Sequence, residues 1–128
     1  MPPFPDWLEF HSRTIGGPVA SVRSRAGIVR FEAGGDEIAD HVLVGIPDDD
    51  AWSAFERTLN EAGFWEWPAD TGHREPHRRG DWYWWLEVQK EGRGHRAAAW
   101  NEAPAGLERV RIALYELVEQ TVTEAVPG

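Results

Sequence analysis

The fold is decided by one hairpin sequence, WYWWLEVQKEGRGHRAAAW, at residues 82–100. In a strand, successive side chains point to opposite faces, so Trp82 and Trp84 share one face and Trp85 lies on the other. A glycine-containing turn at residues 91–94 separates the outgoing strand from its return. This segment therefore predicts a β-hairpin that carries tryptophan on both of its faces.

Four more strand-like stretches precede this hairpin in the chain. Alternating apolar and polar residues, bounded by glycine and proline, are typical of strands that bury one face. The stretches cover residues 4–13, 19–23, 28–33 and 38–46. Their separators are residues 16–18, 24–27 and 34–36, which contain the glycines of turns. The first half of the chain is thus expected to form consecutive antiparallel strands.

Two amphipathic helices are expected, one before the hairpin in the sequence and one after it. Asp48, Asp49 and Asp50 follow a proline and suit the amino terminus of a helix, where carboxylates accept from free N–H groups. Gly63 suits a left-handed cap after this helix, and Pro104 is expected in the first turn of the second. The core-facing stripes are Trp52, Phe55, Leu59 and Ala62, then Leu107, Val110, Leu114 and Leu117.

The predicted element order is β-β-β-β-α-β-β-α. Hairpin-connected strands with appended helices favour an α+β fold, here an antiparallel sheet of about five or six strands packed by two helices on one side. A length of 128 residues is typical of a single domain. Residues 1–6 and 122–128 are expected to be flexible ends.

Composition excludes several classes of protein. The chain has no cysteine, which removes disulfide frameworks and thiolate metal sites. Thirteen basic and 22 acidic residues give a net charge of −9, which argues against nucleic acid as a partner. No apolar run reaches the roughly 18 residues of a membrane span, and residues 1–6 do not resemble a signal peptide, so a cytoplasmic location is expected.

Catalytic and metal-binding patterns are weak. His73, Glu75 and His77 have a spacing that resembles metal ligands, which leaves a metal-dependent enzyme as one hypothesis. Pro76 argues against a helix there, and a solvated loop is the favoured interpretation. No serine lies in a Gly-x-Ser-x-Gly elbow. The sequence therefore predicts no enzyme activity, no cofactor and no metal.

Tryptophan is the most informative residue type, with eight among 128 residues. A small domain cannot bury them all, and exposed tryptophans are typical anchors of protein interfaces. We expect the anchors to be Trp82, Trp84 and Trp85, with Trp65, Trp67 and Trp100 nearby. The loop at residues 71–79 is expected to set specificity through His73, Arg74, His77, Arg78 and Arg79.

Charge is unevenly spread along the chain. Seven acids and no Lys or Arg lie between residues 32 and 50, while residues 71–96 carry six basic and four acidic side chains. A solvated acidic face is one interpretation. Electrostatic steering towards a basic protein surface is the other.

The order of these elements resembles a known family. The features are the early Gly-Gly turn, a helix ending in Glu61-Ala62-Gly63-Phe64, the strand at residues 81–88, a glycine-containing hairpin and a proline-initiated last helix. Together they are similar to emfourin, a proteinaceous inhibitor of protealysin-type metallopeptidases, and to small bacterial domains of unknown function. The resemblance covers residues 8–118. It implies a non-catalytic protein that binds another protein.

Two functions of different classes remain open. The leading hypothesis is a small, acidic protein-binding module, for example an inhibitor or immunity-type partner of an enzyme. It would exist as a monomer or weak homodimer. The alternative is a small-molecule-binding domain with a tryptophan-lined pocket between sheet and helices.

Overall fold

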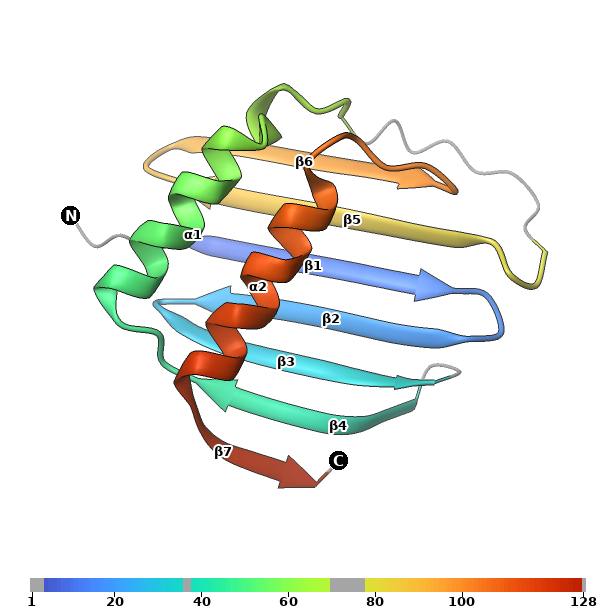
Figure 1. The fold of residues 1–128 in the computed structure, drawn as a ribbon, viewed down its shortest axis with the longest axis horizontal. Helices are drawn as coiled ribbons and strands as arrows, with labels where there is room; N and C mark the ends of the chain where they lie inside the picture. Colours follow the sequence, from blue (N-terminus) through green and yellow to red (C-terminus); the bar gives the residue numbers. More distant parts are fainter. Residues whose placement is uncertain (1–3, 36–37, 70–77, 128) are drawn as a thin grey trace.

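A seven-stranded antiparallel sheet forms one layer of the molecule, and two helices lie across one of its faces (Figure 1). The computed structural model describes residues 4–35, 38–69 and 78–127. The strands are β1 (Trp7–Thr14), β2 (Pro18–Arg25), β3 (Ile28–Gly35), β4 (Ile38–Gly45), β5 (Trp82–Lys90), β6 (Arg93–Trp100) and β7 (Val122–Pro127). Their order in the sheet is β6-β5-β1-β2-β3-β4-β7.

The predicted α+β class is confirmed, and so is the order β-β-β-β-α-β-β-α as far as α2. Strand β7 follows α2 and was not predicted, so the sheet has seven strands where about five or six were expected. Strands β1 to β4 pair consecutively, and the β5–β6 hairpin then joins the free edge of β1. This placement makes β1, the first strand of the chain, an interior strand of the sheet.

Two hairpin turns are tighter than predicted. Ala26 and Gly27 link β2 to β3 with φ angles of 54° and 82°, and Glu91 and Gly92 link β5 to β6 with φ angles of 52° and 80°. Two consecutive residues with positive φ match the twist of the strands that they join. The strands consequently extend into the segments 24–27 and 91–94, which the sequence predicted as loops.

Helix α1 (Asp49–Glu61) begins and ends as predicted. The N–H of Ala51 donates to a carboxylate oxygen of Asp48 at 2.8 Å, and Gly63 has a φ of 75°. A short 3-10 helix, η1 (Phe64–Glu66), follows directly. Within the described ranges, the structure contains no helix long and apolar enough to cross a bilayer.

Helix α2 (Leu107–Thr121) begins later than predicted. Pro104 precedes the helix, and its carbonyl accepts from the N–H of Leu107 at 3.1 Å. Gly106 has a φ of 99°, a value that an α-helix does not contain, so the helix starts after it. A Cβ at position 106 would lie 2.9 Å from that of Ala62, which shows how closely this turn approaches α1.

The hydrophobic core lies between the helices and the sheet. It combines the predicted stripes of α1 and α2 with the side chains that strands β1, β2, β3, β5 and β6 point toward the helices. Its largest fully buried members are Trp52, Trp84, Phe10, Phe64, Leu8, Leu86 and Leu114. Burial of this many large apolar groups is the main source of stability.

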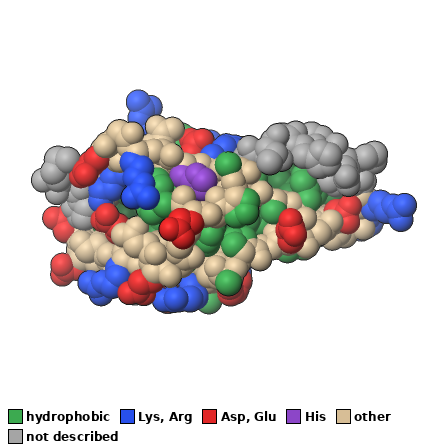
Figure 2. Space-filling model, turned by 90° about the horizontal axis from the view of Figure 1, so that it is seen from above, with side chains coloured by type: hydrophobic (Ala, Val, Ile, Leu, Met, Phe, Trp, Pro, Cys, Tyr) green, Lys and Arg blue, Asp and Glu red, His purple; other side chains and the backbone are tan. Residues whose placement is uncertain are grey.

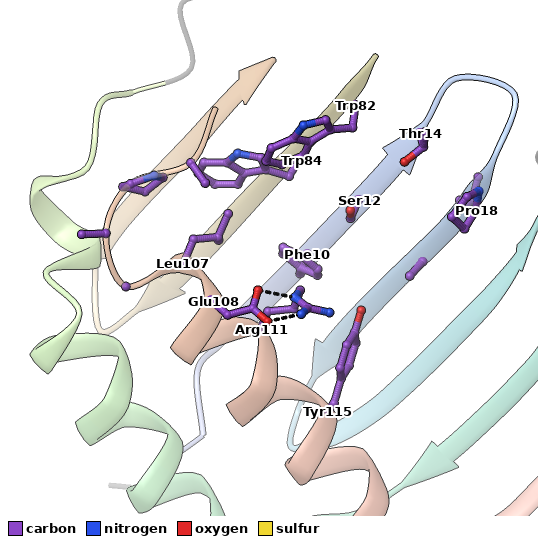
Figure 3. Close-up of a pocket in the computed structure, with 16 residues that line it drawn as sticks. Phe10, Ser12, Thr14, Pro18, Trp82, Trp84, Leu107, Glu108, Arg111 and Tyr115 are labelled. Atoms are coloured by element: carbon purple, nitrogen blue, oxygen red, sulfur yellow. Dashed lines mark hydrogen bonds and ion pairs between the residues drawn. The ribbon is translucent and has the colours of Figure 1, made fainter. Parts of the chain in front are cut away.

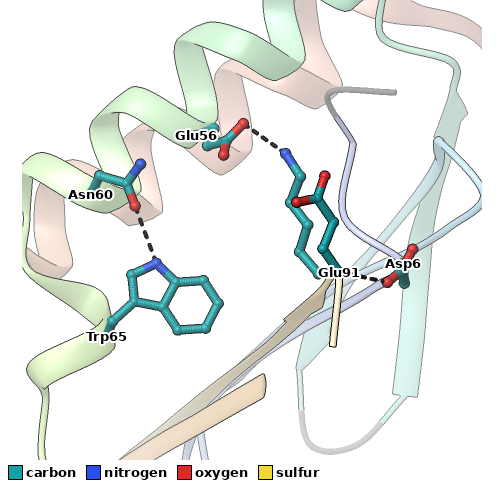
Figure 4. A network of polar contacts seen from close by, with 6 residues as sticks. Asp6, Glu56, Asn60, Trp65 and Glu91 are labelled. Carbon is teal, nitrogen blue, oxygen red and sulfur yellow. Dashed lines mark hydrogen bonds and ion pairs between the residues drawn. The ribbon is translucent and has the colours of Figure 1, made fainter. Parts of the chain in front are cut away.

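The described parts of the two ends that the sequence predicted to be flexible contact the rest of the fold. Asp6 donates its N–H to the carbonyl of Gln89 at 2.9 Å and accepts from the N–H of Glu91 at 3.1 Å (Figure 4). Phe4 packs 6.4 Å from Trp52, measured between ring centroids. At the other end, β7 pairs with β4 and gives that strand a partner on its outer edge. Contacts to the sheet and to α1 are thus present within residues 4–6 and 122–127.

Candidate functional site

Strand β5 sends its tryptophans to the two faces of the sheet, as its alternation predicts. Trp84 points toward the helices, is 2% exposed, and donates its indole N–H to the carbonyl of Glu102 at 2.8 Å. Trp82 lies on the same side and is half-buried. Trp85 lies on the opposite side, which we call the open face because no described helix covers it.

A cluster of aromatic rings covers one end of the open face. His11 stacks on Trp85 with ring centroids 4.2 Å apart, Tyr83 lies 5.9 Å from Trp85, and Tyr83 lies 4.3 Å from Trp100. We call these four residues the aromatic patch. Each is half-buried, so the rings shield one another and still present surface to solvent.

The register of three strands builds this patch. His11 of β1 is directly opposite Trp85 of β5, and Trp100 of β6 is directly opposite Tyr83. Side chains that are opposite in neighbouring strands lie within contact distance on one face. The patch is therefore a product of the pairing of β1 with β5, two strands that are distant in the sequence.

Arginines border the aromatic patch. The guanidinium of Arg96 lies 4.9 Å above the centre of the Trp85 ring and 3.7 Å from a carboxylate oxygen of Glu87. Burial lowers the pKa of His11, the positive charges of Arg13 and Arg23 lower it further, and Glu9 partly opposes them. The lowered pKa favours the neutral form of His11, which stacks on an indole without bringing in an unpaired charge.

The charged residues of the open face differ in their balance from those of the whole chain. Alternation along the strands places five arginines and three glutamates on this face among the described side chains. They are Arg13, Arg23, Arg25, Arg30, Arg96, Glu9, Glu32 and Glu87. In a chain of net charge −9, the described side chains of this face thus sum to a slightly positive charge. Figure 2 shows that both signs are also interspersed when the molecule is seen from above.

One polar atom of the patch has no partner. The indole N–H of Trp85 is buried and makes no hydrogen bond in the described part of the structure. A buried donor without an acceptor costs free energy. Packing of Trp85 against His11 and Arg96 therefore holds the ring in place despite this cost.

The remaining predicted tryptophans lie on the helix side. Trp65 donates its indole N–H to the side-chain oxygen of Asn60 at 3.1 Å (Figure 4), and the guanidinium of Arg93 lies 4.0 Å above its ring. Trp67 is buried and donates to the carbonyl of Ala62 at 3.1 Å. Of the six tryptophans predicted for a binding site, only Trp85 and Trp100 share the open face. Trp84 is buried and hydrogen-bonded within the fold, so we no longer count it as an anchor.

Of the predicted specificity loop, Arg78 and Arg79 belong to the described residues. The N–H of Arg78 donates to a carboxylate oxygen of Asp81 at 2.9 Å, and the side chain of Arg79 lies beside Gly16. The residues His73, Arg74 and His77 lie outside the described residues. The predicted spacing of metal ligands at His73, Glu75 and His77 lies outside them as well. Across residues 4–35, 38–69 and 78–127, no three His, Asp or Glu side chains gather as metal ligands would.

A groove opens on the helix side of the sheet, beyond the first turns of α2 (Figure 3). Its volume is about 620 Å³. Strands β1, β2 and β5 form its floor and one wall, with Trp82 and Trp84 among them. Loop residues 103–106 and the start of α2 form the opposite wall, which includes Arg111 and Tyr115. We call this the helix-side groove. A tryptophan-lined space between sheet and helix is therefore present, as the alternative hypothesis expected.

Sequence reasoning left Tyr83, His11 and Arg96 out of the candidate site. Tyr83 was predictable, because it is two residues before Trp85 and must share its face. His11 and Arg96 were not, because their proximity to Trp85 depends on which strands pair and in what register. Composition and element order do not contain that information.

No family model, curated protein or solved structure matches this chain. The resemblance to emfourin therefore stays a prediction.

Proposed function

We propose that this protein is a non-catalytic module that binds another protein through the open face. The aromatic patch of His11, Tyr83, Trp85 and Trp100 carries the proposal. Large, rigid rings provide contact area at a small cost in side-chain entropy, and Trp, Tyr and Arg dominate the binding energy of protein interfaces. Here such residues stand together on a sheet face that no described helix covers.

The charge pattern favours a protein over a single-stranded nucleic acid. Stacked rings and arginines also occur in single-strand-binding proteins, which line a continuous positive groove for the phosphates. On this face Glu9 and Glu87 are directly opposite each other on β1 and β5, next to the His11–Trp85 pair. They would repel a phosphate backbone that crossed the strands. A protein surface can offer separate partners to the glutamates and to the arginines of this face.

The partner surface should combine apolar groups with carboxylates. Apolar groups would face the aromatic patch. Carboxylates would face Arg23 and Arg25, which are exposed and form no ion pair among the described residues. Arg23 lies opposite Glu9 and Arg30, so one added carboxylate there would lie between two arginines. An enzyme that this module inhibits or neutralises is the partner class that the resemblance suggests.

Paired substitutions on the two sides of the molecule test this proposal. We would use Trp85→Ala and Arg23→Glu on the open face, with Ile112→Ala and Arg57→Glu as matched controls on the helices. Ile112 and Arg57 are exposed, and neither belongs to the patch. Each variant and the wild-type chain would be used as bait in lysate of the native host at physiological salt, with quantitative mass spectrometry of what is retained.

We expect a specific protein that the wild type and both controls retain and that both open-face variants lose. Its affinity for the purified variants should fall by roughly tenfold or more, as for interface anchors. Equal retention by all five baits, or no retained protein at all, would contradict the proposal. So would tight binding of oligo(dT) or oligo(U) that depends on Trp85, because the face would then serve nucleic acid.

A further inference from the structure

The helix-side groove arises from a change of residue type along the strands. On the side that faces the helices, β1 carries Leu8 and Phe10 where α1 and α2 cover it, and then Ser12 and Thr14 beyond them. Strand β2 changes in the same direction, from buried Val22 to Ala20. Large side chains fill the covered half of this face, while small and hydroxyl side chains leave the other half empty. The floor of the groove therefore combines two hydroxyl groups with apolar side chains.

The described lining of the groove has no net charge. Its two charged residues are Glu108 and Arg111, which form a two-pronged hydrogen-bonded ion pair on the first turns of α2 (Figure 3). An anionic ligand would compete with Glu108 for the guanidinium, and a cationic ligand would compete with Arg111 for the carboxylate. The charge of the lining thus favours a neutral occupant.

Aromatic rings and hydroxyl groups face each other across this space. Trp82 stands at one wall and Tyr115 at the other, while the hydroxyls of Ser12 and Thr14 project from the floor (Figure 3). The face of an aromatic ring is negative and attracts C–H groups that carry a partial positive charge. A ligand that satisfies the whole lining needs an apolar C–H face and several hydroxyls.

We propose that the helix-side groove binds a neutral carbohydrate, with the C–H face of a sugar ring packed against Trp82. Its hydroxyls would then bond to Ser12, Thr14 and the outer atoms of the Glu108–Arg111 pair. A flat aromatic ligand would also stack on Trp82, but it would leave the hydroxyl floor without partners. The volume of about 620 Å³ lies within the range of small-ligand sites and leaves room for more than one sugar ring.

Nuclear magnetic resonance of the ¹⁵N-labelled full chain tests this inference. Indole N–H groups resonate apart from the backbone amides, so Trp82 can be followed separately from Trp52 or Trp85. The probes are cellobiose, maltose and N,N′-diacetylchitobiose, each titrated to about 50 mM so that millimolar dissociation constants are detected. Benzoate and free indole serve as an anionic and an uncharged aromatic comparison.

At least one disaccharide should shift the Trp82 signal in a saturable way, and benzoate and indole should bind roughly tenfold more weakly. Trp82→Ala should weaken the disaccharide by about tenfold, which is the loss of one ring contact. Ala20→Leu fills the groove without removing a core side chain, so it should abolish binding in a folded protein. Trp100→Ala, on the open face, should leave sugar binding unchanged.

The absence of a saturable shift with all three disaccharides would overturn the inference. Tighter binding of benzoate or indole would overturn it as well, since the groove would then be a slot for aromatic ligands. Disaccharide binding tests the groove, and retention of a partner protein tests the open face. Because Trp100→Ala changes the open face alone, the two proposals can fail independently.

Discussion

Trp84 and Trp85 are consecutive residues of one strand with opposite environments. Trp84 is buried under the helices, and its indole N–H has an acceptor in Glu102. Trp85 lies on the open face, packed between His11 and Arg96, and its N–H has no acceptor among the described residues. The difference shows how one residue type serves the core on one side of a sheet and a surface patch on the other.

The largest expected effect comes from truncation of the two rings. Trp84→Ala should reduce the free energy of unfolding by about 3–5 kcal/mol, because it opens a cavity in a closed core. Trp85→Ala should cost only about 1 kcal/mol, since its ring is partly solvated and loses chiefly its aromatic contacts. Urea unfolding followed by circular dichroism measures both. Equal losses would mean that Trp85 is as well packed as Trp84, and the comparison would fail.

A smaller effect is expected at the helix layer that covers Trp84. Asp48→Ala removes the oxygen that accepts from the N–H of Ala51, so it should lower the free energy of unfolding by about 1 kcal/mol. Asp48→Asn, which keeps a capping oxygen, should retain most of that stability. Binding of a partner at the open face should be unchanged in both variants. A loss of partner binding in Asp48→Ala would show that the two layers are coupled.

On the open face, the contribution of Arg96 should be smaller again. Arg96→Gln removes the cation above Trp85 and its ion pair with Glu87, and we expect a loss of about 0.5 kcal/mol. The loss should shrink as salt is added, because the ion-pair part is screened. Thermal melts at low and high salt, compared with Arg57→Gln on the helix α1, measure this effect. A loss that does not change with salt would assign the role of Arg96 to packing.

The smallest expected effect is a pH dependence of the open face. The pKa of His11 is lowered in the folded protein, so the unfolded chain binds a proton at this site more readily than the folded chain does. Its contribution to stability is therefore full above the unfolded value of about 6.5 and is lost as pH falls through the lower folded value. Denaturation at pH 7.5 and pH 5 should show this fall in the wild type, and His11→Gln should show less of it.

A stability that stays level or rises in the wild type over this range would contradict the stacking of a neutral imidazole. The emission of Trp85 provides a second observable, because an imidazolium beside an indole quenches its fluorescence. The part of the quenching that disappears in Trp85→Phe isolates that signal, because the other tryptophans emit in both proteins.

Local patterns predicted the elements well and their assembly less well. The stripe of Trp52, Phe55 and Leu59 gave α1 its buried face, and alternation put Trp84 and Trp85 on opposite sides. Both follow from the geometry of a single element. The pairing of β1 with β5 joins distant parts of the chain, so no local pattern predicted that His11 stacks on Trp85. For the same reason, β7 was predicted as a loose tail.

The candidate sites divide in the same way. Trp82 and Trp85 were found by residue type, but the sequence grouped them into one anchor set while the structure assigns them to two separate surfaces. The change from Leu8 and Phe10 to Ser12 and Thr14 is visible in the sequence. That this change creates a groove becomes clear only from the position of α2, which covers Leu8 and Phe10 but leaves Ser12 and Thr14 uncovered.

The interior position of β1 has a consequence for the order of events during synthesis. This strand leaves the ribosome before the other described strands, yet its second neighbour, β5, is made only after β2, β3, β4 and α1. Until β5 arrives, one backbone edge of β1 is unpaired, and Leu8 and Phe10 lack the hairpin side chains that complete their burial. A nascent chain stalled before residue 82 should therefore be a substrate for chaperones, whereas one released after residue 100 can close its sheet.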